Sequence, residues 1–182
     1  MDASERTKYK LAKAVKELMA YTPVDRITVK QIVECCGLTR QTFYRNFKDK
    51  YDLVNWYFDK LAIVSFEQMG VSLTLREGLI KKFEFIKGER HFFTAAFRSE
   101  DHNSLLQHDY DFIYRFYSDI IKKKLQKEIP ADIRFLLEMY CRGSIYMTVQ
   151  WVTEGMKRST EEMADLLIRA LPPELSELLK DL

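Results

Sequence analysis

The stretch Thr28-Val-Lys-Gln-Ile-Val-Glu-Cys-Cys-Gly-Leu-Thr-Arg-Gln-Thr-Phe-Tyr-Arg-Asn-Phe47 carries the signals that decide the fold. Thr28 and Gln31 have the spacing of a capping box, in which each side chain satisfies a free backbone amide of the other at the start of a helix. Gly37 can adopt the left-handed conformation that ends a helix, and Thr39 can cap a second helix. The pattern predicts two short helices joined by a glycine turn, a helix-turn-helix motif.

The second of these helices has two distinct faces. At about 100° per residue, two phenylalanines fall on one side and four polar side chains on the other. The phenylalanines are Phe43 and Phe47, and the polar residues are Arg40, Gln41, Tyr44 and Arg45. In the major groove of DNA, Arg pairs bidentately with guanine and Gln with adenine. We therefore expect Arg40, Gln41 and Arg45 to contact bases, although the charge pattern alone would also fit an ordinary solvated helix face.

Backbone phosphates are expected around this base-reading face. Helix N-termini carry free amides and the positive end of the helix dipole, both of which suit an anion. Lysines at the start of the next helix add positive charge. The expected phosphate contacts are Thr28, Thr39, Tyr44, Lys48 and Lys50. Such contacts fix the position of a protein on duplex DNA without reading its sequence.

Composition favours a helical fold with a basic N-terminal part. The 182 residues are 47% hydrophobic and 31% charged, and 6 Gly and 4 Pro leave little room for the turns of a β-rich protein. The first 50 residues hold 11 of the 29 Lys and Arg but only 6 of the 27 Asp and Glu. A surface for a polyanion is therefore expected in this part of the chain.

Helical periodicity extends along the rest of the chain. Segments with an apolar stripe at this spacing cover residues 8–20, 51–69, 75–86, 92–97, 105–125, 131–155 and 160–171, and Pro172-Pro173 ends the last of them. We predict an all-α chain with two domains. A three-helix head spans residues 5–65, with the helix-turn-helix at 28–47, and a larger helical domain spans residues 66–182.

Several other functional classes find no support in the sequence. It has no G-x-S-x-G, H-E-x-x-H or glycine-rich phosphate-loop motif, so an enzyme is not expected. His91, His102 and His108 lack the spacing of a helical metal pair and fit surface loops, and no metal or cofactor is expected. The three cysteines fit small buried apolar residues. Without a leader or a run of about 18 apolar residues, we expect a cytoplasmic protein with no membrane span.

Aromatic residues are abundant beyond residue 50, where the chain holds 10 Phe, 7 Tyr and 2 Trp. Such residues usually form core, and core is the favoured interpretation here. A small-molecule pocket would also need polar groups that converge on it. The candidate effector pocket combines both kinds of side chain in Phe97, Arg98, Phe116, Arg142, Tyr146 and Trp151.

The helix-turn-helix region resembles the N-terminal DNA-binding domain of the TetR family of regulators. The matching residues are Thr28-Val29, Ile32, Gly37-Leu38-Thr39, Thr42-Phe43-Tyr44, Phe47, Lys50 and Leu53. Cys35 and Cys36 depart from the small alanines that the family usually has before the turn glycine. The resemblance implies an all-helical homodimer of about nine helices per chain that binds a near-palindromic operator in double-stranded DNA. It also implies that residues 131–155 and 160–171 form a four-helix dimer interface, which makes residues 66–182 the regulatory and dimerisation domain.

Two segments of the second domain are similar to regulators of dihydroxyacetone kinase operons within this family. They are Arg98-Ser-Glu-Asp-His-Asn103 and Tyr140-Cys-Arg-Gly-Ser144. This resemblance implies a transcriptional activator that acts with a dihydroxyacetone-binding, kinase-like protein partner. Two alternatives stay open on the residues alone. The chain could be a repressor released by a small molecule, or a helical protein-interaction module whose basic arc docks on an acidic protein without specific DNA binding.

Overall fold

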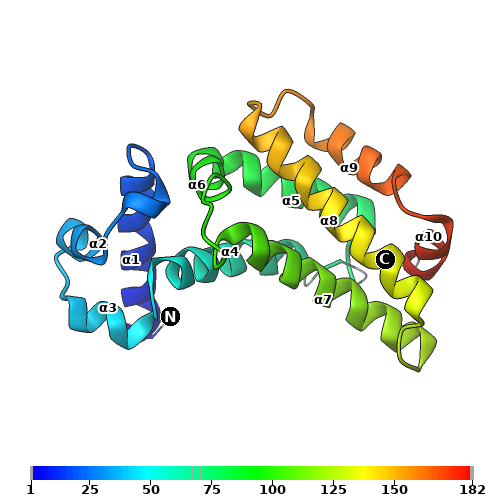
Figure 1. Ribbon diagram of the computed structural model, residues 1–182, viewed down its shortest axis with the longest axis horizontal. Coiled ribbons are helices and arrows are strands. Elements are labelled where there is room, and N and C mark those ends of the chain that lie inside the picture. Colours follow the sequence, from blue (N-terminus) through cyan, green and yellow to red (C-terminus); the bar gives the residue numbers. More distant parts are fainter. Residues whose placement is uncertain (1, 67, 70, 181–182) are drawn as a thin grey trace. The chain divides into compact units, whose positions relative to one another are not determined.

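The structure describes residues 2–66, 68–69 and 71–180, which form helices joined by turns and short irregular segments (Figure 1). In this computed structural model the described residues form ten α-helices and no named β-strand. They are α1 (Ala3–Met19), α2 (Val29–Cys36), α3 (Arg40–Asn46), α4 (Lys50–Phe66), α5 (Leu75–Gly88), α6 (Arg90–Ala96), α7 (Leu105–Leu125), α8 (Ala131–Thr153), α9 (Thr160–Arg169) and α10 (Pro173–Leu179), with a 3-10 helix, η1 (Val24–Arg26), between α1 and α2. The predicted all-α class is confirmed.

The chain forms two compact units, each built from two separate stretches of sequence. Unit 1 comprises Met1–Leu61 and Glu89–His108, and unit 2 comprises Ala62–Gly88 and Asp109–Leu182. The second segment of unit 1 contains α6, whose buried Phe92 and Phe93 meet Tyr57 and Phe58 of α4 edge to face. The head predicted at residues 5–65 does not include the second segment of unit 1, residues 89–108.

The core of the helix-turn-helix forms where α1 packs against α2 and α3. Leu11 and Val15 of α1, Ile32 of α2 and Phe43 of α3 are all fully buried. Of the three cysteines predicted to be buried, only Cys141 is buried, whereas Cys36 is half-buried and Cys35 is exposed, so the prediction is wrong for Cys35. The buried apolar residues of α2, Ile32 and Val33, thus supply its part of this core.

Both ends of α2 follow the local signals. Thr28 N donates to Gln31 Oε1 at 2.8 Å and Gln31 N donates to Thr28 Oγ1 at 3.3 Å, which confirms the capping box. Gly37 is left-handed, with φ 64° and ψ 35°. The amide of Leu38 donates to Val33 O at 2.9 Å and closes the turn. The glycine turn therefore directs the chain from α2 into α3.

In unit 2, α8 and α9 lie side by side (Figure 1). They meet where Tyr140 Oη on α8 donates to Leu167 O on α9 at 3.2 Å. α5 packs along α9, and Arg76 of α5 forms a salt bridge of 2.7 Å with Asp165 of α9. The apolar stripe predicted for residues 131–155 is the buried side of α8. Its burial joins α8 to the rest of the unit.

The chain continues into α10 after the two prolines that were expected to end the helical part. Pro173 lies in the first turn, where its missing N–H removes no helical hydrogen bond and its fixed φ suits a helix. Leu175 and Leu179 are buried, and α10 packs against α8. This helix is additional to those that the family resemblance implied.

Replacing Gly37 with Ala should lower the free energy of unfolding by about 1 kcal/mol, because a side chain in the left-handed conformation is strained even in open space. Apart from the two chain neighbours of Gly37, no described residue has a heavy atom within 4 Å of the added Cβ, so a clash does not contribute. Urea titrations followed by circular dichroism measure the change. Gly88→Ala is the matched control, since Gly88 also has open space but an ordinary φ. Equal effects of the two substitutions would contradict the prediction.

Candidate nucleic-acid interface

One face of α3 is polar and exposed. Arg40, Gln41 and Arg45 are exposed, and none of them makes a hydrogen bond or ion pair with another described residue. Phe43 and Phe47 on the other side of the helix are buried. The structure thus brings together the three residues predicted to contact bases and leaves their polar groups available to a partner.

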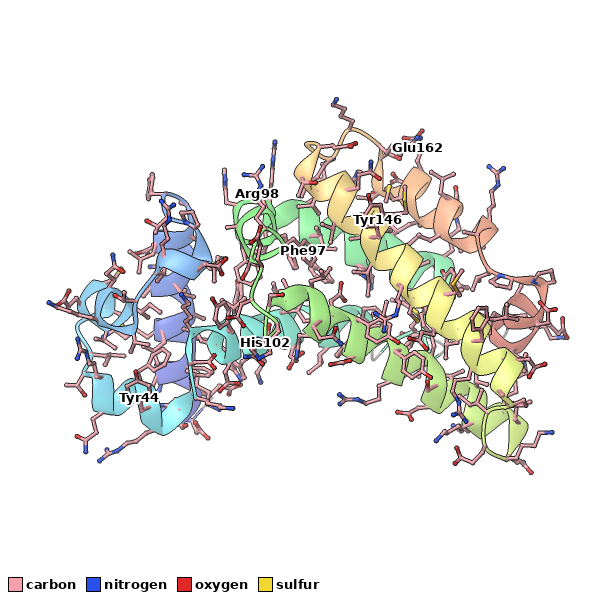
Figure 2. All side chains as sticks on the ribbon, viewed as in Figure 1. Tyr44, Phe97, Arg98, His102, Tyr146 and Glu162 are labelled. Atoms are coloured by element: carbon pink, nitrogen blue, oxygen red, sulfur yellow. The ribbon has the colours of Figure 1, made fainter. Side chains whose placement is uncertain are left out.

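Tyr44 and Lys48 extend this surface. Tyr44 lies on the exposed side of α3 (Figure 2), with its side chain 59% exposed. Its ring meets that of Phe43 edge to face, with 5.4 Å between centroids, so the ring is oriented while the hydroxyl is free to donate. Lys48 is exposed, and its backbone amide donates to Asp52 Oδ2 at 2.8 Å. Both side chains can reach a polyanion without giving up an internal bond.

The hydroxyls of the two helix caps are already engaged inside the protein. Thr28 Oγ1 donates to Gln31 Oε1 at 2.8 Å. Thr39 Oγ1 accepts from Thr42 N at 3.1 Å and lies 3.0 Å from Thr42 Oγ1. The hydroxyl of Thr42 can supply the proton in that second contact, which leaves the proton of Thr39 able to turn outward. Thr39 is thus better placed than Thr28 to donate to a phosphate.

Lys50 is placed differently from Lys48. Its Nζ donates to the carbonyl oxygens of Asp25 and Ile27 at 2.7 and 2.9 Å, and it lies 5.1 Å from the centroid of the Tyr51 ring. Burial lowers the pKa of this ammonium, an effect that the Asp25 charge opposes. Lys50 therefore ties the start of α4 to the segment before α2. One of its three protons is left for a phosphate.

Asp25 is a residue of this region that the sequence did not single out. Its Oδ1 accepts from Ser99 Oγ at 2.5 Å and from Tyr51 Oη at 3.0 Å. The hydrogen bond from Ser99 is the main cause that lowers the pKa of the Asp25 carboxyl. Burial, together with the contact to Asp25, raises the pKa of Tyr51 to about 12. No local pattern marks this cluster, because the partners of Asp25 lie 26 and 74 positions away.

A second exposed surface, on α8 and α9, is apolar. Phe135, Met139 and Tyr146 share one stripe of α8 and are 64%, 61% and 68% exposed, and Leu166 of α9 is also exposed. Figure 2 shows Tyr146 on α8. A groove of about 600 Å³ lies between α8 and α9 and is lined by residues of both helices and of the segment that joins them. We call this surface the α8–α9 face. Exposed apolar surface of this kind is typical of a protein–protein interface.

The residues of the candidate effector pocket are distributed over both units. Phe97 and Arg98 belong to unit 1, and the other four belong to unit 2. The residues with core or half-buried positions are Phe97, Phe116 and Trp151, and the exposed ones are Arg98, Arg142 and Tyr146. Trp151 packs on Phe83 with 5.3 Å between ring centroids, whereas Arg142 pairs with Glu138 on the surface of α8. A pocket lined by these six residues stays a prediction.

A buried ion pair is the main polar feature inside unit 2, and the sequence did not single it out. Lys82 Nζ on α5 lies 3.9 Å from Asp109 Oδ1 on α7, and both residues are almost fully buried. Lys82 also lies 5.8 Å from the centroid of the Phe66 ring. Burial raises the pKa of the Cys141 thiol to about 12, an effect that the Lys82 charge reduces. Because buried charges are unfavourable unless paired, these two positions depend on each other.

Histidine and acidic residues do not form a metal centre in the described part of the chain, where no group of three His, Cys, Asp or Glu could hold an ion. His108, expected in a surface loop, lies in α7 with its Nε2 2.7 Å from Asp59 Oδ1. His102 is exposed in the segment between α6 and α7. Among the same described residues, no helix is both long enough and apolar enough to cross a membrane.

Comparison with known proteins gives two family models that cover most of the chain. The model for bacterial regulatory proteins of the tetR family matches residues 11–56, which contain the helix-turn-helix. The model for a transcriptional regulator C-terminal region of the same family matches residues 74–172, more than half of the chain.

Individual relatives agree with these models. The HTH-type dhaKLM operon transcriptional activator DhaS of Lactococcus lactis subsp. lactis is 37% identical over 49 residues, which are 27% of this chain and 26% of that protein, so the match spans about a quarter of the relative. The solved structure of a dihydroxyacetone kinase operon activator DhaS has a TM-score of 0.62 at 17% identity and covers 96% of both chains. A TetR transcriptional regulator from Streptococcus agalactiae has a TM-score of 0.68 at 18% identity, over 97% of this chain and 95% of that one.

The two solved structures establish the fold, and the family models establish the lineage over both units. The helix-turn-helix resemblance read from Thr28 to Leu53 falls inside the first matched region. The segment Tyr140 to Ser144 falls inside the second. The chain belongs to the TetR family of bacterial regulatory proteins, which are DNA-binding regulators of transcription.

Proposed function

We propose that the chain is a dimeric regulator that reads a near-palindromic operator with α3. The observation that carries this proposal is the polar arc of α3, where Arg40, Gln41 and Arg45 are exposed and have no hydrogen-bond or ion-pair partner among the described residues, while Phe43 and Phe47 behind them are buried. A solvated helix face needs no such anchoring, nor two capped helices with a glycine turn between them. Two heads related by two-fold symmetry would match the two half-sites of the operator.

Within each head, base reading and phosphate binding fall to different side chains. Arg40, Gln41 and Arg45 carry the donors and acceptors that distinguish base pairs in the major groove. The phosphate contacts comprise Tyr44 and Lys48 as free side chains, Thr39 and Thr28 as helix caps, and Lys50 through its remaining proton. These five positions would set the register of α3 on the duplex.

The α8–α9 face is the proposed dimer interface. Its stripe of exposed Phe135, Met139 and Tyr146 would be covered by the same surface of a second copy, as a two-fold interface requires. The hydrophobic effect favours this burial, and the aromatic and Met side chains are enriched in such interfaces. Dimerisation through unit 2 would supply the two heads of the first proposal.

For biological role, we propose activation of a dihydroxyacetone kinase operon, together with a kinase-like protein that binds dihydroxyacetone. The names of two matched proteins support the operon and the sign of regulation. The partner is supported by the segments at residues 98–103 and 140–144 that resemble such regulators. Co-purification with the candidate kinase-like protein, with and without dihydroxyacetone, measures whether the complex depends on this compound. We further propose a cytoplasmic protein without enzymatic activity.

A second candidate is a repressor released by a small molecule. The groove of about 600 Å³ lined by residues of α8 and α9 favours it, because small-molecule sites are concave and mostly apolar. A helical protein-interaction module is the third alternative. It differs from both regulators in having no preferred DNA sequence.

Selection of binding sites from random duplex DNA tests the proposed function. We expect enrichment of a dyad with two related half-sites, bound with strong salt dependence because basic side chains displace counterions from the DNA. Binding isotherms of the selected duplex at several salt concentrations give the affinity and the salt slope. Recovery of no dyad would overturn the proposal and favour the interaction module.

Gln41→Ala should relax specificity at one base pair in each half-site by about 1–3 kcal/mol, because the amide is lost from the base-reading arc. Lys48→Ala should instead weaken all duplexes alike and reduce the salt slope by about one unit for each lost phosphate contact. The measurement is the affinity for the selected operator and for duplexes with single-base changes. If Gln41→Ala weakened specific and random DNA equally, this residue would not be a base reader.

Tyr146→Glu should raise the dissociation constant of the dimer by about 100-fold or more, because a carboxylate would be buried in an apolar interface. Sedimentation at a series of protein concentrations measures the dimer, and binding to the full dyad should weaken in parallel. Tyr21→Glu, at an exposed tyrosine of unit 1, is the control and should leave the dimer unchanged. An intact dimer in the Tyr146 variant would remove the α8–α9 face from the interface.

A further inference from the structure

The carboxylate of Asp25 joins η1 to the segment between α6 and α7. Besides its bonds from Ser99 and Tyr51, it accepts from the amide of Glu100 at Oδ2, 3.3 Å away. The hydroxyl of Ser99 also accepts from the amide of Asp101 at 3.4 Å, so the same residue is held from both sides. Hydrogen bonds to an ionised carboxylate are stronger than neutral ones. Asp25 thus connects η1 to residues 99 and 100, which are distant in sequence but belong to the same unit.

The other end of this segment is fastened to α4. Asn55 Nδ2 donates to the carbonyl of Asn103 at 3.0 Å, and Asp101 Oδ1 accepts from the amide of Asn103 at 2.8 Å. His108, just beyond, contacts Asp59 of α4. Residues 99–103, which we call the α6–α7 strap, are therefore held at both ends within unit 1.

Through Asp25, the strap contacts the segment that leads into the DNA-binding motif. Asp25 precedes Thr28, the cap of α2, by three residues, and Lys50 grips the carbonyls of Asp25 and Ile27 from α4. Short helices such as α2 and α3 do not keep their orientation by themselves, so the segment that leads into α2 sets where the motif begins. None of the strap residues belongs to the polar arc of α3.

We propose that Asp25 is a positioning residue through which the α6–α7 strap, chiefly Ser99, holds the helix-turn-helix in its DNA-binding pose. This inference rests on the proposed operator binding and deepens it. The Asp25–Ser99 hydrogen bond contributes to affinity by holding α2 and α3 in place before DNA binds. This lowers the conformational entropy that is lost on binding. The hydrogen bond itself adds no contact to DNA. The wider consequence is that a change in the strap that moves Ser99 or Glu100 alters operator affinity through Asp25.

Operator binding by Ser99→Ala in the full chain tests this proposal, with the duplex obtained by selection as the probe. We expect affinity to fall about ten-fold, because one hydrogen bond to a carboxylate is lost, while the salt slope stays at its wild-type value because no phosphate contact is lost. Ser99→Thr keeps the hydroxyl and should restore affinity. Ser176→Ala, at an exposed serine of α10, is the matched control and should bind like wild type.

A double-mutant cycle separates positioning from simple loss of structure. In an Asp25→Ala background, Ser99→Ala should have little further effect, since its partner is already gone. Tyr51→Phe removes a different donor to Asp25 and should weaken binding in the same direction, with Tyr21→Phe as its control. Thermal unfolding of each variant shows whether it is folded, and the Thr and Phe variants test the proposal if the Ala variant is not.

Three outcomes would overturn the inference. Ser99→Ala could bind the operator within about two-fold of Ser176→Ala, the losses from Asp25→Ala and Ser99→Ala could add fully, or the salt slope could fall by about one unit, as for a lost phosphate contact. Failure of the proposed function looks different, because the wild-type chain itself would then select no dyad. The two failures are therefore distinguishable in one set of measurements.

Discussion

The burial of Phe43 is the constraint on which the DNA-binding unit depends. Phe43 contacts Phe47 at 5.9 Å between ring centroids, and Phe47 contacts Trp56 of α4 at 5.7 Å. α3 has only seven residues, so its helical form and direction come from this packing and not from its own propensity. Burial of a large aromatic side chain contributes about 1.5–3 kcal/mol, enough to decide the orientation of so short a helix. The polar arc points outward because the rings behind it are fixed.

Polar contacts fix the relative positions of elements that the aromatic contacts bring together. Apolar packing is not directional, whereas a hydrogen bond requires defined positions for both of its groups. Lys50 provides such directionality between α4 and η1, and Asp25 provides it between η1 and residues 99–103. At Lys50, two of the three ammonium protons make these internal hydrogen bonds and one is left for a phosphate. Lys48, two residues earlier, keeps its ammonium at the surface.

The sequence was informative where the cause of structure is local. The caps at Thr28 and Thr39, the turn at Gly37 and the stripe of α8 depend on neighbours within a few residues. The outward direction of Arg40 and Gln41 could be predicted because Phe43 and Phe47 fall on the opposite side of the same helix. Contacts between distant positions could not be predicted in this way, as Asp25 with Ser99 and Lys82 with Asp109 show. Pro172-Pro173 misled for a different reason, since a proline that stops one helix can also begin the next. The six-residue effector pocket combines residues of both units and stays a prediction.

The buried side of α10 bears on where this chain can be shortened or extended. The prolines before it resemble a natural end, and a chain cut there would lose the two leucines that cover part of unit 2. The surface uncovered would be apolar, and newly exposed apolar surface promotes aggregation. A purification tag or a fused fluorescent protein therefore belongs beyond Leu179, separated from α10 by a flexible linker.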